Sequence, residues 1–165
     1  MKDIQEIFKA QSQHQYKLGN SSASQRISRL NALKKALETT YRSQLKEALY
    51  KDFKKPALET DLTEIHPVIS EIKLVKKQLK SWMQPQRVKS PLVFIGSSAY
   101  VHHEPKGVCL IISPWNFPVN LTFGPLVSAI AAGNTVMIKP SEMTPNTASV
   151  MADIVASVFK PEEVA

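Results

Sequence analysis

Apolar side chains recur every three or four residues through the first 84 residues, a spacing that predicts amphipathic helices. The first helix presents Ile4, Ile7 and Phe8 on its apolar face and ends near Gly19 and Asn20. The serines that follow offer N-caps for a second, longer helix. The apolar face of that second helix is predicted to consist of Ile27, Leu30, Leu33, Leu37, Tyr41, Leu45 and Leu49.

Two prolines divide this helical region. Pro56 is expected to end the second helix, because a proline inside a helix removes a backbone donor and clashes with the preceding turn. Pro67 lies inside the third apolar pattern, which predicts either a kink or a new helix with Pro67 in its first turn. The apolar face of the third segment is predicted to consist of Leu58, Leu62, Ile65, Ile69, Ile72, Leu79 and Trp82.

The pattern becomes extended after Pro85 and Pro91. Residues 92–95 and 99–103, separated by a glycine-serine turn, are typical of a short β-hairpin. Residues 108–112 form a continuous apolar run, which is typical of a strand covered on both faces.

Strand and helix then alternate to residue 165. After the strand at 108–112 we expect a helix over 121–132, a strand over 135–138 and a helix over 145–159, with Thr144 as its candidate cap. This order implies parallel strands joined by a right-handed crossover. The predicted fold class is α/β, with N-terminal helices, a β-hairpin and part of a Rossmann-like parallel sheet. The expected divisions are 1–91 (helical), 92–104 (hairpin) and 105–165 (first part of the sheet domain). Such a sheet normally has five or six strands, so we expect the chain to be truncated within its fold.

Positive charge is concentrated late in the helical region, and the formal net charge is +7. No nucleic-acid-binding motif accompanies this charge, and aromatic residues make up only 7% of the chain, so we expect no nucleic acid partner. Leucine and valine residues interleave with the cations, which favours the solvent-facing side of an amphipathic helix. The cations concerned are Lys73, Lys76, Lys77, Lys80, Arg87 and Lys89.

Hydropathy and cysteine content indicate a location. No apolar run approaches the roughly 18 residues that a membrane span needs, and the N-terminus has no secretion-signal pattern. The single cysteine, Cys109, excludes an internal disulfide, so we expect a cytoplasmic protein. No metal site is expected either, because His102 and His103 would point to opposite faces of a strand.

Two short segments after the predicted buried strands carry candidate chemistry, since ligands in α/β sheets bind beyond the carboxyl ends of strands. In residues 113–118, two prolines hold Trp115, Asn116 and Phe117, and a fixed amide is a suitable donor to an oxyanion. The alternative is a turn whose asparagine satisfies its own backbone.

The second segment is residues 139–142, where Lys139 and Glu142 could contact the hydroxyls of a ribose. The alternative is a surface ion pair near a helix start. No G-x-G-x-x-G motif follows either strand, so the usual pyrophosphate cradle is absent from this sequence.

Together these segments resemble the aldehyde dehydrogenase family. The resemblance rests on residues 105–118 (PKGVCLIISPWNFP), Gly124 with Pro125, residues 129–134 (AIAAGN) and residues 138–142 (IKPSE), in this order and spacing. Residues 59–62 (ETDL) and 80–83 (KSWM) resemble the class 3 branch, which acts on fatty and aromatic aldehydes. The resemblance spans the chain but only about the first third of a full member.

The resemblance implies an NAD- or NADP-dependent oxidation of an aldehyde to a carboxylic acid, and a homodimer in the full-length protein. Asn116 matches the catalytic asparagine whose amide helps to stabilise the thiohemiacetal oxyanion. Glu142 should repel the 2′-phosphate of NADP, whereas Lys139 could accept it. The implied cofactor-binding residues are Ser113, Trp115, Lys139, Ser141 and Glu142, and Phe117 is implied to line the substrate tunnel.

The nucleophilic cysteine and the general-base glutamate of the family pattern fall after residue 165. Cys109 does not replace the nucleophile, because it lies in an apolar strand before the asparagine, where a buried thiol is expected to be inert. We therefore expect the 165 residues to be inactive alone. The alternative is a truncated, non-catalytic chain that acts, if at all, as a binding or oligomerisation module, with exposed sheet edges.

Overall fold

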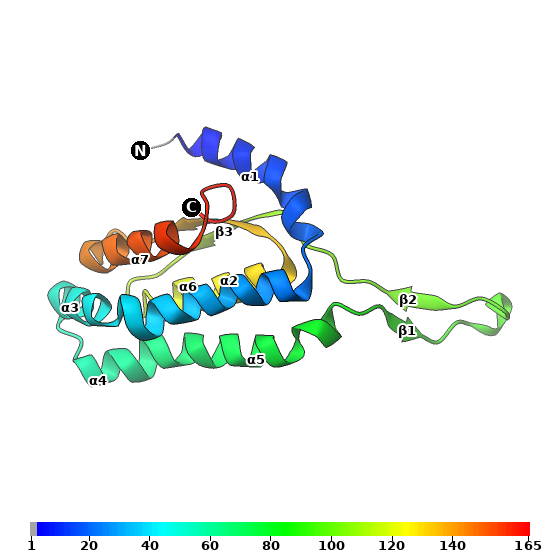
Figure 1. The fold of residues 1–165 in the computed structure, drawn as a ribbon, viewed down its shortest axis with the longest axis horizontal. Helices are drawn as coiled ribbons and strands as arrows, with labels where there is room; N and C mark the ends of the chain where they lie inside the picture. Colours follow the sequence, from blue (N-terminus) through cyan, green and yellow to red (C-terminus); the bar gives the residue numbers. More distant parts are fainter. Residues whose placement is uncertain (1–2) are drawn as a thin grey trace.

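The computed structural model describes residues 3–165, which form a helical layer, a small parallel sheet and a projecting arm (Figure 1). The sheet lies between α1 on one face and α6 on the other, and the helical layer (α2 to α5) packs against α6 and α7. The helices are α1 (Ile4–Gly19), α2 (Ala23–Lys35), α3 (Arg42–Phe53), α4 (Ala57–Glu59), α5 (His66–Trp82), α6 (Asn120–Ala132) and α7 (Pro145–Val158), with π-helical turns η1 (Ala36–Thr40) and η2 (Thr60–Ile65) and the 3-10 turn η3 (Leu92–Phe94). The strands are β1 (Gln86–Val88), β2 (Ala99–Val101), β3 (Val108–Ile112) and β4 (Thr135–Lys139).

The start of α2 confirms the predicted serine cap. The Ser22 hydroxyl accepts a hydrogen bond from the Gln25 backbone N–H at 3.3 Å. The Gln25 side chain in return accepts the Ser22 backbone N–H at 2.8 Å, so two otherwise free donors at the helix start are satisfied. The preceding helix ends at Gly19, as predicted.

The long apolar stripe is buried as predicted except at Ile27 and Tyr41, which are half-buried, but the prediction of a single helix to carry it is wrong. The π-helical turn η1 separates α2 from α3, and the Tyr41 N–H reaches back to the Ala36 carbonyl oxygen at 2.8 Å. A stripe spaced by four residues drifts by about 40° per step on a regular α-helix. The wider turn absorbs this drift. The stripe members with no exposed surface are Leu30, Leu33, Leu37, Leu45 and Leu49.

Pro67 lies in the first turn of α5, as predicted, but the π-helical turn η2 leads into α5 without leaving the helical backbone region, so this is not a separate start after a break. The apolar face predicted for this third segment is partly wrong, because Leu58 is 70%, Leu62 60% and Trp82 41% exposed. The π-helical turn η2 changes the angular spacing before α5, so Leu58 and Leu62 fall off the buried face. The members that are buried as predicted are Ile65, Ile69, Ile72 and Leu79.

The solvent-facing interpretation of the lysines is confirmed on α5. Its lysines are exposed while the apolar residues between them, including Val75, are buried. Leu74 is an exception, because it lies on the exposed side. Arg87 and Lys89 lie on the arm beyond the helix.

The arm, residues 86–101, corrects the predicted hairpin. Strand β1 pairs with β2 in antiparallel register, from Gln86 opposite Val101 to Val88 opposite Ala99. The predicted first strand at 92–95 is instead a 3-10 turn with an exposed apolar tip (Figure 1). Pro91 accepts the Phe94 N–H at 2.9 Å, which closes the turn and leaves these residues without a strand partner.

Strands β3 and β4 are parallel and connected by α6, as predicted from the alternation of elements. Their register runs from Val108 opposite Thr135 to Ile112 opposite Lys139. Residues 163–165 extend the sheet along the free edge of β4, where the Ile138 N–H donates to the Ala165 carbonyl at 2.7 Å.

The expectation that β3 is covered on both faces holds on one face only. Ile111 is buried toward the core, whereas Leu110 is 62% and Ile112 69% exposed. Helix α1 stands beside this second face, and its residues Ile4 and Phe8 line a groove together with Leu110 and Ile112. Ile4 and Phe8 are themselves exposed, so α1 does not bury the apolar face predicted for it.

The start of α7 corrects the predicted Thr144 cap. Thr144 occupies the N-cap position, but its side chain makes no capping hydrogen bond. Asp52 at the end of α3 supplies the cap instead: its carboxylate accepts the Asn146 N–H at 3.1 Å and the Thr147 N–H at 2.8 Å. Within residues 3–165, no helix is long and apolar enough to cross a membrane.

Candidate active site

The asparagine turn, residues 113–118, connects β3 to α6. Its first residue, Ser113, is 4% exposed and donates its backbone N–H to the Lys139 carbonyl at 3.0 Å, which continues the pairing of β3 with β4 by one residue. The hydroxyls of Thr122 on α6 and Ser113 are hydrogen-bonded to each other at 2.6 Å, with Ser113 as the donor because the Thr122 proton is given to the Pro118 carbonyl oxygen. The start of the turn is therefore fixed to both the sheet and the helix.

The end of the asparagine turn is held by Lys55 and Glu64 from the helical layer. These two side chains form an ion pair, with 3% and 0% of their surfaces exposed. The Lys55 ammonium donates to the backbone carbonyl oxygen of Asn116 at 3.2 Å. The Glu64 carboxylate accepts the backbone N–H groups of Val119 at 3.1 Å and Asn120 at 3.0 Å, which places a negative charge at the start of α6.

Sequence reasoning missed both members of this pair. A signal was available for Glu64, because it lies four residues before Val68 and eight before Ile72, on the face that α5 buries. An acidic side chain on a buried helix face needs a hydrogen-bond or ion-pair partner inside the protein. Lys55 carries no such signal, since it follows the end of α3 and its direction is set by Lys54 in the left-handed region at φ 63°.

Asn116 itself is exposed at the middle of the turn. Among residues 3–165 no hydrogen bond of its side-chain amide is seen, and the choice between an oxyanion donor and a turn-stabilising amide stays a prediction. Trp115 is 57% exposed, and Phe117 is half-buried with its ring 4.3 Å from the Lys55 ammonium. The turn thus has a fixed backbone and a free amide.

The β4 turn, residues 139–144 counting the last residue of β4, lies at the same edge of the sheet because β3 and β4 are parallel. Lys139 and Glu142 form an ion pair whose side chains are 55% and 77% exposed. The hydrogen bond from Lys139 lowers the pKa of Glu142, and a backbone hydrogen bond acts in the same direction. Ser141 is buried, and its hydroxyl accepts the Met143 N–H at 3.2 Å.

The parallel sheet therefore brings the two candidate segments together, through the hydrogen bond from Ser113 to Lys139. It also produces the surface ion pair that was the alternative interpretation of Lys139 and Glu142. These two side chains reach solvent, so a cofactor ribose could hydrogen-bond both an ammonium and a carboxylate there. The residues present fit that part of a nucleotide.

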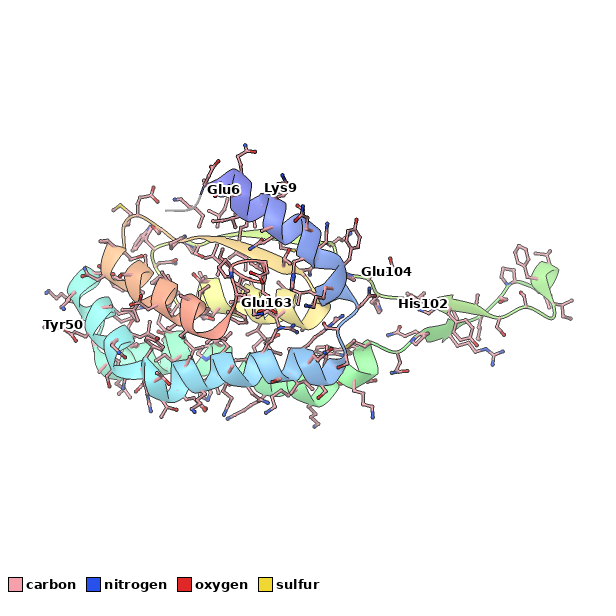
Figure 2. The ribbon with its side chains drawn as sticks, turned by 45° about the horizontal axis from the view of Figure 1, so that its top comes forward. Glu6, Lys9, Tyr50, His102, Glu104 and Glu163 are labelled. Carbon is pink, nitrogen blue, oxygen red and sulfur yellow. The ribbon has the colours of Figure 1, made fainter. Side chains whose placement is uncertain are left out.

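Cys109 and His102 lie outside this edge. Cys109 is half-buried within β3, and burial raises the pKa of its thiol, which opposes formation of a nucleophilic thiolate. Figure 2 shows His102 beside the arm, away from the sheet. In the described part of the chain, no group of three or more histidine, cysteine or acidic side chains could hold a metal ion.

Comparison with known proteins supports the family resemblance that these segments carry. The model of the aldehyde dehydrogenase family matches residues 1–165, and the chain belongs to that family. It is 43% identical over 134 residues to the 4,4'-diaponeurosporen-aldehyde dehydrogenase of Staphylococcus aureus, which covers 81% of the chain and 29% of that protein. It is 46% identical over 110 residues to aldehyde dehydrogenase family 3 member B1 of Bos taurus, which covers 67% of the chain and 24% of that protein. The relatives place it in the class 3 branch.

Solved structures share the fold over nearly the whole chain. The substrate-bound Staphylococcus aureus AldH superposes with a TM-score of 0.94 at 38% identity, over 99% of this chain and 36% of that one. An aldehyde dehydrogenase from Burkholderia cenocepacia gives a TM-score of 0.81 at 26% identity, over 96% of this chain and 32% of that one. The chain therefore spans about a third or less of the length of these relatives.

Proposed function

We propose that these residues form the oxyanion-stabilising and ribose-binding part of an NAD(P)-dependent enzyme that oxidises aldehydes to carboxylic acids. The observation that carries the proposal is the asparagine turn. Its backbone is fixed at both ends, its exposed Asn116 amide has no partner among the described residues, and the polar β4 turn lies at the same sheet edge.

Asn116 acts as the oxyanion donor in this proposal. By resemblance to the family, a cysteine thiolate from a part of the enzyme beyond residue 165 adds to the aldehyde carbon, and the carbonyl oxygen becomes an oxyanion. A donor that is already oriented needs no rearrangement as this charge develops, which is why a fixed amide stabilises the transition state. Phe117 lines the substrate side of the same turn.

Lys139 and Glu142 hold the adenosine ribose, and Ser141 fixes the turn that carries them. Ser113 and Trp115 border the nicotinamide side, where Ser113 contributes mainly by fixing the start of the asparagine turn. When bound, a nicotinamide cofactor would supply the hydride acceptor for oxidation of the aldehyde carbon. Hydrolysis of the resulting thioester, with the family's glutamate as base, releases the carboxylic acid.

NAD is the cofactor that the ion pair favours over NADP. Glu142 is ionised at neutral pH, because the hydrogen bond from Lys139 lowers its pKa, and a carboxylate repels a 2′-phosphate. Lys139 is engaged by Glu142 and is less available to that phosphate. We place the enzyme in the cytoplasm, in keeping with its single cysteine.

The test is an aldehyde oxidation assay on the native protein that contains residues 1–165. Aliphatic and aromatic aldehydes are supplied with NAD⁺ or NADP⁺, and formation of the reduced cofactor is followed by absorbance. We expect turnover with both aldehyde classes and a higher kcat/KM with NAD⁺. A folded native protein that reduces neither cofactor would contradict the proposal.

Assembly through the arm is a second proposal, supported by its apolar tip. Leu92 is 89%, Val93 83% and Ile95 88% exposed. Contact of these apolar side chains with water is unfavourable unless another protein surface covers them. A homodimer through the arm is the expected assembly. Sedimentation of the native protein should show a dimer, and replacement of Val93 and Ile95 by serine should shift it toward monomer.

A further inference from the structure

We infer that the buried Lys55–Glu64 ion pair is a positioning device that sets the orientation of the asparagine turn. The catalytic consequence of this inference rests on the proposed function of Asn116. The positioning itself is a property of the fold and can be measured separately.

Burial of the pair is the first observation. Two opposite charges with 3% and 0% exposure lose their hydration on folding, and a pair of apolar side chains of similar volume would often give equal or better stability. Packing alone therefore does not account for an ion pair here. What the charges provide in addition is a set of directed contacts.

Apart from the bond that joins the two side chains, the hydrogen bonds of the pair reach the asparagine turn and the start of α6, while the Lys55 ammonium also lies 5.0 Å from the centre of the Phe53 ring at the end of α3. The Lys55 ammonium holds the Asn116 carbonyl at 3.2 Å and lies 4.3 Å from the centre of the Phe117 ring. The Glu64 carboxylate holds the next backbone groups, the N–H of Val119 and of Asn120. The backbone is thus held at the catalytic residue and within four residues after it.

The pair also connects the turn to a separate layer of the fold. Lys55 follows α3 and Glu64 lies in η2, so both anchors come from the helical layer, more than 50 residues earlier in the chain than Asn116. The other end of the turn is held by the sheet through Ser113. Asn116 therefore lies between one anchor on the sheet and one on the helical layer.

The test compares Lys55→Met, the double variant Lys55→Met/Glu64→Gln and the control Lys46→Met in the native protein. Lys46 forms a partly exposed ion pair with Asp61 within the helical layer. Turnover, the KM for NAD⁺, unfolding in urea and the exposure of Trp115 are measured for each. Trp115 is one of two tryptophans, so a Trp82→Phe background isolates its fluorescence.

Lys55→Met should lower kcat by about 10- to 100-fold, the scale for a misplaced catalytic group, with little change in the KM for NAD⁺. Acrylamide quenching of Trp115 should increase because the turn loosens. The double variant should regain stability, because no buried charge is left unpaired. Its kcat should stay low, since the hydrogen bond to the Asn116 carbonyl is still missing. Lys46→Met should resemble the wild type.

A purely structural pair would behave differently: kcat and Trp115 quenching would return to wild-type values in the double variant as stability recovers. That result, or unchanged Trp115 quenching in Lys55→Met, would overturn the inference. If the wild type oxidises no aldehyde, the proposed function fails, and the quenching data still decide whether the pair holds the turn.

Discussion

Helices α6 and α7, which follow the asparagine turn and the β4 turn, are both capped by a carboxylate from the helical layer, but the two carboxylates differ in how deeply they are buried. Neither α6 nor α7 is capped by its own side chain, and each receives a carboxylate from the helical layer. Glu64 caps α6 from a position with no exposed surface and is paired with Lys55. Asp52 caps α7 from a partly exposed position, with hydrogen bonds from Asn146 and Thr147.

The difference in burial between the two caps matches the roles proposed for the two turns. The turn before α6 carries Asn116, which in the proposed function needs a fixed orientation toward a developing charge. The turn before α7 carries Lys139 and Glu142, an exposed pair for binding that tolerates adjustment. A buried, charge-paired cap is shielded from salt and water, whereas an exposed cap mainly stabilises its helix. The helical layer therefore fixes the asparagine turn more firmly than the β4 turn.

The largest expected difference is between the two caps themselves. Glu64→Ala removes the partner of a buried ammonium and the acceptor of two backbone N–H groups. We expect it to lower the free energy of unfolding by about 3–5 kcal/mol, the usual cost of breaking a buried ion pair. Urea unfolding of the native protein measures this loss. If Glu64→Ala lowered the free energy of unfolding by less than Asp52→Ala does, the buried cap would not be the stronger of the two.

Asp52→Ala is the matched change at α7, and it should cost about 1 kcal/mol, as is common for an N-cap. Only hydrogen bonds at a partly exposed position are lost, and no opposite charge is left unpaired. Turnover should remain close to that of the wild type, because the asparagine turn keeps its own anchors. A large fall in turnover at unchanged stability would show that the α7 cap also serves catalysis.

The pH dependence of the Asp52 cap sharpens the same comparison. Burial raises the pKa of Asp52, but hydrogen bonds from Asn146 and Thr147 outweigh it, and the net pKa lies below the ordinary value of 3.8. Its stabilisation is therefore present above about pH 4 and is lost as the pH falls through the depressed pKa. The difference in unfolding free energy between the wild type and Asp52→Asn should shrink in acid. A difference that is unchanged at pH 3 would contradict this.

The smallest expected effect is at the β4 turn. Glu142→Gln keeps the shape of the side chain but removes the charge that pairs with Lys139. We expect the KM for NAD⁺ to rise several-fold, with a smaller change in turnover, because ribose binding is affected and the chemical step is not. Steady-state kinetics with varied NAD⁺ measures the split. An effect confined to the aldehyde would refute the ribose assignment.

Local pattern was enough to predict the sheet-edge turns. Alternating apolar runs and glycine or proline breaks predict β3, α6, β4 and α7, and parallel pairing brings Ser113 and Lys139 together. The arm was misjudged because residues 92–95 are all apolar and include the β-branched Val93 and Ile95, although no strand lies opposite them. The π-helical turn η1 was missed because the apolar spacing whose angular drift it absorbs continues without a break in the sequence.

The anchors of the turns could not be predicted from local pattern. Lys55 meets Asn116 across 61 residues, and Asp52 meets Asn146 across 94. Such contacts depend on how the helical layer packs against α6 and α7, which no short-range periodicity records. Only Glu64 left a trace, as an acid on the buried face that leads into α5.

The most direct measurement is the turnover of Asn116→Ala in the native protein, with Asn120→Ala as the neighbouring control. Asn116 is exposed, so we expect unchanged stability and a fall in kcat of about 100-fold or more, the scale for losing one oxyanion donor. Asn120 donates its amide to the Thr63 carbonyl and should affect stability more than turnover. A folded Asn116→Ala protein with wild-type kcat would contradict the account.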